Sequence, residues 1–221
     1  MSAEPIADEP GAAEPLRDEP FTPEILERST PFQGKVWDVV SETFRYNGEP
    51  ITREFVDHTG AVAVLAMDDE ERVLLIRQYR HPIRSRDWEI PAGLLDEDGE
   101  PALTAAQREL AEEADLAAEQ WNVLAEYVNS PGGSNETVRV YLARGVSEVD
   151  AFEREAEEAD IEVRWVSLDE ALAAVLSRDL QNPSTVIGVL TAAAHRASGW
   201  ADLAPGDAPW PRHPKLGRAD W

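Results

Sequence analysis

The feature that most constrains this chain is an acidic segment that runs from Gly93 to Leu116. If the segment is helical, Glu109, Glu112 and Glu113 stand at positions i, i+3 and i+4, and their carboxylates share one face. Apolar residues fall on another face, where they can pack against a core: Leu103, Ala106 and Leu110. Three like charges repel one another unless a cation lies among them, and carboxylate oxygens are ligands that Mg²⁺ or Mn²⁺ prefers. The segment therefore predicts a divalent cation site, with a merely solvated acidic face as the other interpretation.

The residues before this helix place it beside a strand and a turn. Trp88 to Gly93 reads as a short strand that runs into a glycine turn, and the acidic loop from Asp96 to Glu100 follows. Pro101 then stands where a helix can begin, at a position that needs no backbone donor. This order of strand, loop and acid-faced helix predicts a metal cluster at the mouth of the helix.

The segment resembles the Nudix box, G-x5-E-x7-R-E-U-x-E-E-x-G-U, in which U is an aliphatic residue. The residues that match by type are Gly93, Glu100, Arg108, Glu109, Leu110, Glu112, Glu113 and Leu116. The loop between Gly93 and Glu100 is one residue longer than in the box. Asp115 replaces the second Gly, at a place where the backbone is usually left-handed and where Asp is tolerated better than most residues. The resemblance implies an α/β (α+β) Nudix fold, with a mixed β-sheet sandwiched between helices.

Composition agrees with a globular enzyme of this kind. Hydrophobic residues make up 43% of the 221 residues, and there is no cysteine, so the chain has neither a disulfide framework nor a thiolate nucleophile. The 44 acidic residues against 20 basic ones give a net charge of -24, which repels nucleic acid and anionic membranes. No apolar run reaches membrane length and no signal peptide begins the chain. We expect a cytoplasmic protein with no nucleic-acid partner and no membrane partner.

The chain divides into four predicted parts. Glu, Pro and Ala dominate its start, a composition typical of disorder, and Lys35 to Phe55 reads as strands around an Asn47-Gly48 turn. The C-terminal tail is either disordered or docked on the body. The predicted parts are a disordered acidic tail (1–20), a small N-terminal antiparallel β domain that contributes to dimerisation (21–60), a Nudix hydrolase domain (61–198) and a C-terminal tail (199–221).

Apolar, β-branched runs and helix caps predict the elements of the main domain. Strands are expected at Val62 to Met67, Val73 to Tyr79, Trp121 to Val128, Thr137 to Leu142 and Ile161 to Val166. Ser167 opens a capping box for a helix that ends near Ser177. Asn182 begins the last helix, which ends near Ala197.

Several stretches outside the box are similar to Nudix ADP-ribose pyrophosphatases of the actinobacterial type. They are the extra N-terminal hairpin, Arg53-Glu54, the segment 58–64, Gln78-Tyr79-Arg80, Trp88 to Gly93, and Pro131. Pro131 alone reads equally well as a turn proline. The resemblance implies metal-dependent hydrolysis of ADP-ribose, a nucleoside diphosphate sugar, to AMP and ribose 5-phosphate. It also implies a homodimer whose N-terminal domains are exchanged and help to build each active site.

The resemblance further implies which residues hold the metal. Glu109 and Glu113 would be the principal ligands of Mg²⁺ (or Mn²⁺), Glu112 a further or bridging ligand, and the Ala92 carbonyl a ligand at the strand end. Because hydrolysis of a diphosphate depends on positioning and electrostatic stabilisation, Glu109 and Glu113 count as catalytic residues.

Arg108 belongs to the same catalytic motif, but we interpret its partnership with Glu100 as an ion pair that joins loop and helix. In the resembling subfamily, the base that activates water lies outside the box, in a loop before a late strand. The acidic run before Ile161 corresponds to this loop, and its register favours Glu158, with Glu157 as the alternative.

Candidate substrate-binding residues lie outside the box. Arg53 and Arg80 suit the phosphate or ribose groups because arginine binds phosphate with two parallel hydrogen bonds. Glu89 belongs to the same set, and Trp37 or Phe44 could stack on adenine, with core packing as the other interpretation. The four histidines show no metal-ligand spacing, and we interpret them as structural or surface residues: His58, His81, His195 and His213.

Other functions are open from the sequence. A GDP-mannose or other sugar-nucleotide hydrolase shares the dimeric design, and a non-catalytic Nudix sensor would bind ADP-ribose without cleaving it. A nucleoside triphosphatase would usually lack the N-terminal hairpin, and an isoprenyl diphosphate isomerase needs a cysteine. Sensors commonly lose box carboxylates, whereas Glu109, Glu112 and Glu113 are all present here.

Overall fold

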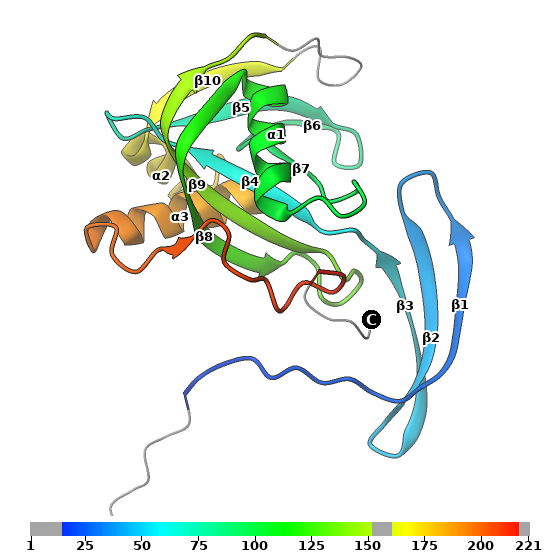
Figure 1. Cartoon of the computed structure of the whole chain (residues 1–221). Coiled ribbons are helices and arrows are strands. Elements are labelled where there is room, and N and C mark those ends of the chain that lie inside the picture. The colour runs from blue at the N-terminus through cyan, green and yellow to red at the C-terminus, as the bar shows by residue number, and fades with distance from the viewer. Residues whose placement is uncertain (1–14, 152–160, 217–221) are drawn as a thin grey trace, which may run out of the picture.

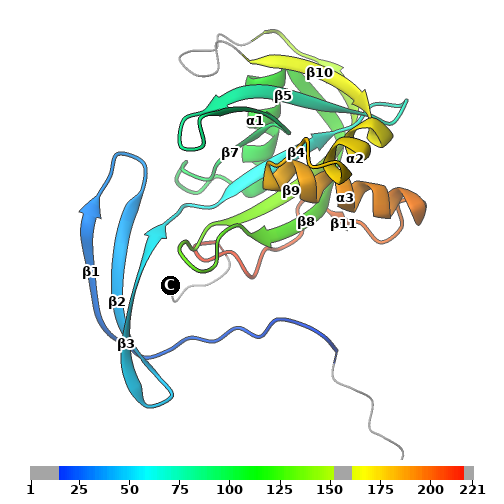
Figure 2. The same cartoon turned by 180° about the vertical axis from the view of Figure 1, so that it is seen from behind.

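The computed structural model describes residues 15–151 and 161–216 as a body of sheets and helices with a separate N-terminal sheet (Figures 1 and 2). Its helices are α1 (Ala102–Ala114), α2 (Leu168–Leu176) and α3 (Pro183–Ala197). Its strands are β1 (Ile25–Gln33), β2 (Asp38–Tyr46), β3 (Glu49–Asp57), β4 (Ala61–Ala66), β5 (Arg72–Arg80), β6 (Ser85–Glu89), β7 (Ala92–Leu94), β8 (Leu116–Val128), β9 (Thr137–Glu148), β10 (Glu162–Ser167) and β11 (Ala204–Pro205). None of the helices in these two ranges combines the length and the apolar character that crossing a membrane requires.

Strands β1, β2 and β3 form an antiparallel N-terminal sheet that stands away from the body (Figure 1). Asn47 and Gly48 both have positive φ, 51° and 87°, in the two-residue turn between β2 and β3. This is the geometry that Asn-Gly hairpin turns favour, so the predicted hairpin is confirmed. Strand β1 was not predicted, because its residues do not alternate and the register shifts between Ser29 and Phe32, around Pro31. Proline is tolerated on such an edge strand.

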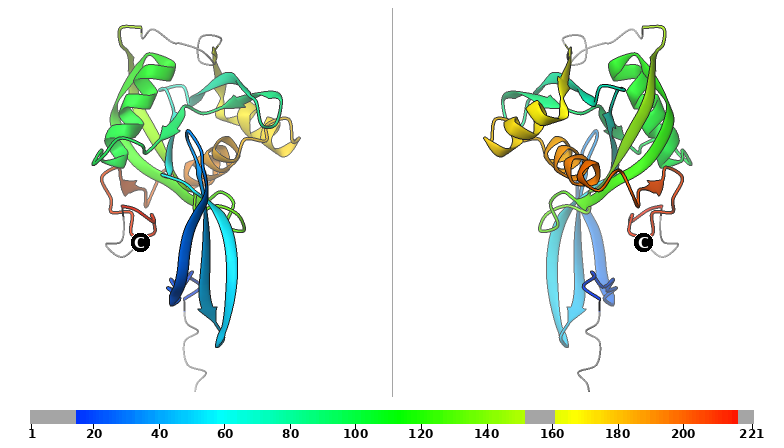
Figure 3. Two further views of the ribbon diagram at one scale, coloured as in Figure 1. Left: turned by 90° about the vertical axis from the view of Figure 1, so that its right-hand side faces the viewer. Right: turned by 90° about the vertical axis from the view of Figure 1, so that its left-hand side faces the viewer.

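The body is built on a mixed sheet of order β11-β8-β9-β4-β7, beside a second sheet of order β10-β5-β6. Strands β4 and β9 are parallel, and the other pairs are antiparallel. The side chains of β4 alternate between the two faces of the sheet. Val62 and Val64 pack with Leu110 of α1, whereas Ala63 and Leu65 pack on the face that carries α2 and α3. Figure 3 shows α1 on one side of the strands and α2 and α3 on the other, so the predicted sandwich is confirmed.

The helix ends follow the local rules read from the sequence. Asp115 ends α1 with a left-handed backbone, φ 55°. The Ser167 hydroxyl accepts a hydrogen bond from the Glu170 backbone N–H at 3.1 Å and caps α2. The Asn182 side chain accepts one from the Thr185 N–H at 3.0 Å and caps α3. Pro101 lies one position earlier than expected, as the N-cap of α1.

Two parts of the chain differ from the sequence prediction. The single strand expected from Trp88 to Gly93 is two strands, β6 and β7, which pair with β5 and β4 respectively. Pro91 separates them because it has no backbone N–H for a ladder, and its carbonyl accepts from the Val64 N–H at 2.8 Å. Strands β8 and β9 are longer than predicted, and β8 begins directly after Asp115.

The C-terminal segment, residues 204–216, is docked on the body rather than disordered. β11 pairs with β8, and the Trp210 side chain is buried. Arg139 of β9, only 2% exposed, donates to the carbonyls of Ala208 at 2.7 Å and Pro209 at 3.0 Å. Its guanidinium also lies 4.7 Å from the centre of the Trp210 ring. A buried arginine thus anchors the segment by hydrogen bonds and a cation–π contact.

Candidate active site

The acidic face of α1 lies directly against the backbone of β7. The Glu113 side chain is buried, with the residue 5% exposed, and its carboxylate accepts a hydrogen bond from the Ala92 N–H at 2.8 Å. The Glu109 carboxylate occupies the space beside Gly93, where a Cβ atom would lie 2.0 Å from the carboxyl carbon. A glycine is therefore required at position 93 for the Glu109 carboxylate to occupy this place beside the strand.

Arg108 binds three carboxylates and ties the helix to the preceding loop. Its Nε and Nη2 donate to the two oxygens of Glu100 at 3.2 and 3.1 Å, the forked geometry of a strong arginine–carboxylate pair. Its Nη1 donates to Glu109 at 2.6 Å and to Glu112 at 3.2 Å. Hydrogen bonding to Glu100, followed by the charge of Glu109, raises the pKa of Arg108 above its already high ordinary value, so this residue stays charged. These contacts agree with the ion pair predicted between Arg108 and Glu100.

The donor set of this face fits a divalent cation chemically. Within residues 15–151 and 161–216, no three acidic or histidine side chains are already gathered as a metal site. Arg108 instead provides the positive charge that Glu109 and Glu112 share, and Glu113 accepts from Ala92. A cation would find hard oxygen ligands here, in carboxylates held against a strand backbone. It would compete with Arg108 for the charge of Glu109 and Glu112.

A cleft of about 840 Å³ opens over β7 and brings together four of the predicted residues. Trp37, Arg80, Glu89 and Ala92 all line it. The Glu89 side chain, only 2% exposed, forms a forked pair with Arg80, with N–O distances of 2.9 and 2.7 Å. Buried beneath the guanidinium, Glu89 fixes the direction of the Arg80 side chain at the cleft. The sequence did not indicate this pair, and the predicted role of Glu89 in substrate binding stays a prediction.

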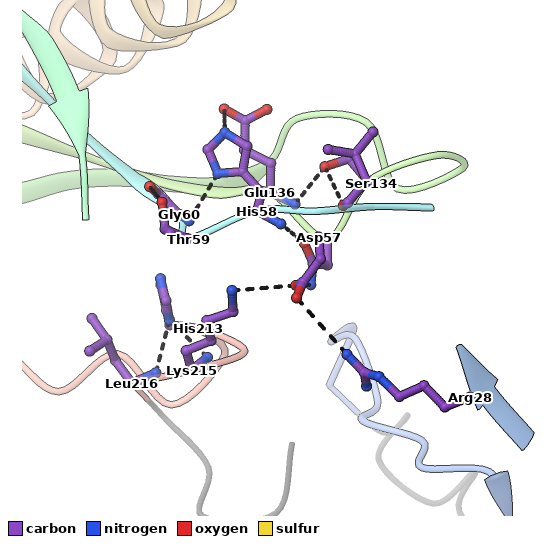
Figure 4. A network of polar contacts seen from close by, with 12 residues as sticks. Arg28, Asp57, His58, Thr59, Gly60, Ser134, Glu136, His213, Lys215 and Leu216 are labelled. Carbon is purple, nitrogen blue, oxygen red and sulfur yellow. Dashed lines mark hydrogen bonds and ion pairs between the residues drawn. The ribbon is translucent and has the colours of Figure 1, made fainter. Parts of the chain in front are cut away.

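Trp37 reaches the cleft from the turn between β1 and β2, and its indole stacks on the imidazole of His58. The ring centres are 4.1 Å apart and the planes are 17° from parallel. His58 Nδ1 accepts from the Gly60 N–H at 2.9 Å, so a neutral ring carries its proton on Nε2, which lies 3.5 Å from Glu136 (Figure 4). Burial lowers the pKa of His58, against the charge of Glu136, which raises it. The indole thus has a supported face, and its packing partner is a histidine rather than the core.

The predicted residues of α1 do not line this cleft themselves. They lie beside β7, whose Ala92 and Gly93 line it, and their roles in metal binding and catalysis stay predictions: Arg108, Glu109, Glu112 and Glu113. Arg53, on β3, lines a second cavity of about 1,200 Å³ between the N-terminal sheet and the loop that contains Pro131. Its Nη1 donates to the Thr52 carbonyl at 2.7 Å. Glu157 and Glu158 lie outside the described residues. The structure therefore leaves the roles of these three residues as predictions.

Comparison with known proteins decides the family. A model of the NUDIX domain matches residues 57–184, more than half of the chain. The chain belongs to the Nudix family. It is 42% identical to an ADP-ribose pyrophosphatase of Mycobacterium tuberculosis over 189 residues, which are 85% of this chain and 90% of that protein. It is 38% identical to an ADP-ribose pyrophosphatase of Bacillus subtilis over 72% of this chain and 85% of that protein.

A solved structure shares the Nudix fold. The crystal structure of an ADP compounds hydrolase superposes with a TM-score of 0.69 and covers 83% of this chain and 99% of that one. Its sequence is only 21% identical, so this likeness concerns the fold alone.

Sequence reasoning missed the residues that close the other side of the Nudix cleft. The N-terminal end of α3 lines it through Asn182, Pro183 and Ser184. The Ser184 hydroxyl and the Tyr127 hydroxyl share a hydrogen bond of 2.7 Å. The side chain of Thr185, next in the chain, accepts from the Ile90 N–H at 3.0 Å. A serine in a first helical turn reads equally well as a capping residue, so only the fold reveals that Ser184 lines the cleft, while Thr185 is buried behind it.

Gly93→Ala is expected to lower turnover by about 10- to 10²-fold, because the new Cβ would displace Glu109 from its position beside β7. Gly188→Ala is the matched control, since its Cβ would meet only ordinary contacts at 3.4 Å and lies in a helix interior, which alanine favours. Steady-state kinetics with circular dichroism on both variants test this. Equal turnover in the two variants would show that the close approach of Glu109 has no catalytic role.

Proposed function

We propose that this protein hydrolyses the diphosphate bond of ADP-ribose, giving AMP and ribose 5-phosphate, with bound Mg²⁺ or Mn²⁺. The observation that carries this proposal is the intact acidic face of α1, set against β7 on the floor of a cleft that Trp37 and Arg80 line. Two relatives that carry the name ADP-ribose pyrophosphatase, at 38% and 42% identity over most of the chain, support the choice of substrate. We also propose a cytoplasmic location, with which a chain that needs no disulfides for its stability is compatible.

In this proposal the residues of α1 and β7 hold the cation. Glu109 and Glu113 are its principal ligands, with Glu112 and the Ala92 carbonyl as further ones. When bound, such an ion polarises phosphoryl oxygens and lowers the pKa of a bound water. Arg108, fixed by Glu100, keeps the helix and the loop in register and balances part of the acidic charge.

The cleft residues bind and orient the substrate. Arg80, held by the buried Glu89, presents a fixed guanidinium to the diphosphate or ribose, where two parallel hydrogen bonds are possible. Trp37, backed by His58, offers an aromatic face to adenine. Because the protein carries a net charge of -24, these local cations and the metal must overcome a field that repels a diphosphate.

A panel of substrates tests the activity. With Mg²⁺ present, we expect ADP-ribose to have the highest kcat/KM, and AMP and ribose 5-phosphate to be the products found by chromatography. Deoxynucleoside triphosphates should be poor substrates. GDP-mannose cleaved with the higher specificity constant would move the protein to the sugar-nucleotide hydrolases, and binding of ADP-ribose without any product would make it a sensor.

We also propose that the working enzyme is a homodimer that exchanges its N-terminal sheets. A sheet of three strands needs a hydrophobic face that packs against another element in order to be stable. This sheet exposes large apolar side chains that monomers rarely leave uncovered: Ile25, Leu26, Phe32 and Tyr46. Arg53 lines the cavity between this sheet and the body, where a partner could approach it. Arg53 would then serve the partner's cleft.

Mixing two inactive variants tests this exchange. If Arg53 serves the partner's site, a heterodimer of Arg53→Ala and Glu113→Gln chains contains one site with both residues intact. Random mixing should then restore about a quarter of the wild-type activity, because half of the dimers are heterodimers with one working site. Glu113→Gln mixed with Gly93→Ala is the control and should restore nothing, since both changes lie on the same chain's site. No recovery after subunit exchange has been demonstrated would refute a shared site.

A further inference from the structure

Two histidines from opposite ends of the chain lie on either side of Gly60, in the segment 57–60 that connects the N-terminal sheet to the body (Figure 4). On one side, His58 Nδ1 accepts from the Gly60 N–H at 2.9 Å. On the other side lies His213, whose Nε2 would be 2.2 Å from a Cβ placed on Gly60. Gly60 also has φ +89°, a conformation that favours glycine. The connection is therefore shaped around the His213 ring.

The position of His213 is fixed by its own segment. The residue is 1% exposed, and its Nδ1 accepts from the backbone N–H groups of Lys215 at 3.1 Å and Leu216 at 2.9 Å. The Trp210 ring packs edge-on at 4.7 Å, and Arg139 holds Trp210 in turn. The ring is thus tied to β9 through a chain of buried contacts.

The same segment touches the connection at a second point. Lys215 Nζ lies 3.4 Å from the Asp57 carboxylate, which also accepts from the Asn135 side chain at 2.8 Å (Figure 4). The side-chain amide oxygen of Asn135, Oδ1, accepts a hydrogen bond from the His58 backbone N–H at 2.7 Å. His58 is therefore held from both sides, and its ring is the surface on which Trp37 stacks at the cleft.

We propose that His213 is a positioning residue for substrate binding, which holds Gly60 and, through His58, keeps the Trp37 indole in place at the cleft. This rests on the proposed function of Trp37 as the residue that stacks on the nucleobase. The C-terminal segment is then a functional part of the binding site, although none of its side chains needs to touch the substrate.

This arrangement requires both imidazoles to be neutral, because each Nδ1 accepts from backbone N–H groups. The charged groups around them are Asp57 of β3, Glu136 before β9, Arg139 of β9 and Lys215 of the C-terminal segment. Burial lowers the pKa of His213 to about 4 and also lowers that of His58. The stability that the buried neutral His213 contributes is present above the ordinary value of 6.5 and falls as the pH drops from there toward 4.

The test compares His213→Ala with His213→Asn at about pH 8, where both histidines are neutral. We expect His213→Ala to raise KM for ADP-ribose about tenfold, with kcat within about threefold of wild type, because binding is impaired and the chemistry is not. Asparagine places a carbonyl oxygen near the position of Nδ1 and should recover most of the loss. His195→Ala is the control and should leave KM unchanged, because His195 is a half-buried residue of α3 that contacts the Ala201 carbonyl and does not line the cleft. A fall in kcat with KM constant, or equal effects in the alanine and asparagine variants, would overturn the proposal.

A double-mutant comparison tests whether the effect passes through Trp37. If it does, His213→Ala added to Trp37→Ala should raise KM no further, whereas additive effects would show that His213 acts by another route. Should His213→Ala fail to fold, His213→Leu fills most of the space with an apolar side chain that lacks both ring nitrogens, and the same comparisons apply.

A measurement that does not need activity separates this inference from the proposed function. The indole N–H resonance of Trp37, assigned by its loss in Trp37→Phe, should shift in His213→Ala and stay in place in His195→Ala. An unshifted Trp37 resonance overturns the positioning role whatever the substrate is. If the wild-type protein does not cleave ADP-ribose but the Trp37 resonance shifts in His213→Ala, the proposed function is wrong and the positioning role of His213 stands.

Discussion

Replacing Glu113 by glutamine is expected to lower the turnover of ADP-ribose by about 10²- to 10³-fold, the loss typical of removing a principal electrostatic stabiliser. Glutamine keeps the size of the side chain, and its carbonyl oxygen can still accept from the Ala92 N–H, which now donates to Glu113 at 2.8 Å. The contact between α1 and β7 therefore survives the change. What is lost is one negative charge on the face that would hold the cation.

Measuring the rate as a function of Mg²⁺ concentration distinguishes a metal-binding role of Glu113 from a purely structural one. We expect Glu113→Gln to need more Mg²⁺ for half-maximal rate, while its thermal unfolding midpoint stays close to that of the wild type. Glu97→Gln, which removes the same charge from an exposed position in the preceding loop, is the control and should keep wild-type kinetics. Turnover of Glu113→Gln within a few-fold of wild type at subsaturating Mg²⁺ would exclude the ligand role.

Local patterns were enough to predict most of the body. The runs of Val, Leu and Ile in β4 and β5 become buried strands, and the caps at Ser167 and Asn182 form as expected. The acidic face of α1 was predictable because positions i, i+3 and i+4 fix a common direction on any helix. Even the left-handed Asp115 followed from its place after the last helical turn.

Features that depend on residues distant in sequence could not be predicted. Arg139 and Ala208 are 69 positions apart, and nothing around either residue indicates that one anchors the other. The stack of Trp37 on His58 likewise joins a turn of the N-terminal sheet to the start of the body, and each residue alone reads as core or surface. Glu89 was predicted to bind substrate, and nothing in the sequence around it indicates the buried pair that it forms with Arg80.

The carboxylates on and before α1 repel one another and need a positive charge among them. Glu100, Glu109 and Glu112 surround a single guanidinium, that of Arg108, in a protein that is already strongly acidic. Without a metal, Arg108 is the cation that allows these carboxylates to lie together. A bound divalent ion would relieve the same repulsion with a larger charge, which is why we expect this helix face to bind one.

Glu158→Gln is expected to reduce kcat by about 10²- to 10⁴-fold, the usual value of a positioned general base. Glu158 lies outside the described residues, but the strand that follows it restricts where it can act. Glu162 of β10 pairs with Arg77 of β5, and Arg77 pairs on its other side with Trp88, which lines the cleft. Two strand spacings separate Glu162 from Trp88, about 10 Å, whereas the four residues from 158 to 162 span up to about 14 Å. The distance is therefore no obstacle to Glu158 acting in the cleft, and this role stays a prediction.

Comparing Glu158→Gln with Glu157→Gln decides which of the two residues is the general base. At saturating Mg²⁺, we expect Glu158→Gln to lose most of its kcat with KM nearly unchanged, because the base acts after the substrate has bound, and Glu157→Gln to be milder. Since Glu109 and Glu113 are intact in both variants, the Mg²⁺ concentration for half-maximal rate should change much less than the rate. A more severe loss of kcat in Glu157→Gln would show that Glu157, and not Glu158, is the general base. Full activity in both variants would mean that the cation and its ligands activate the water without a base from this loop.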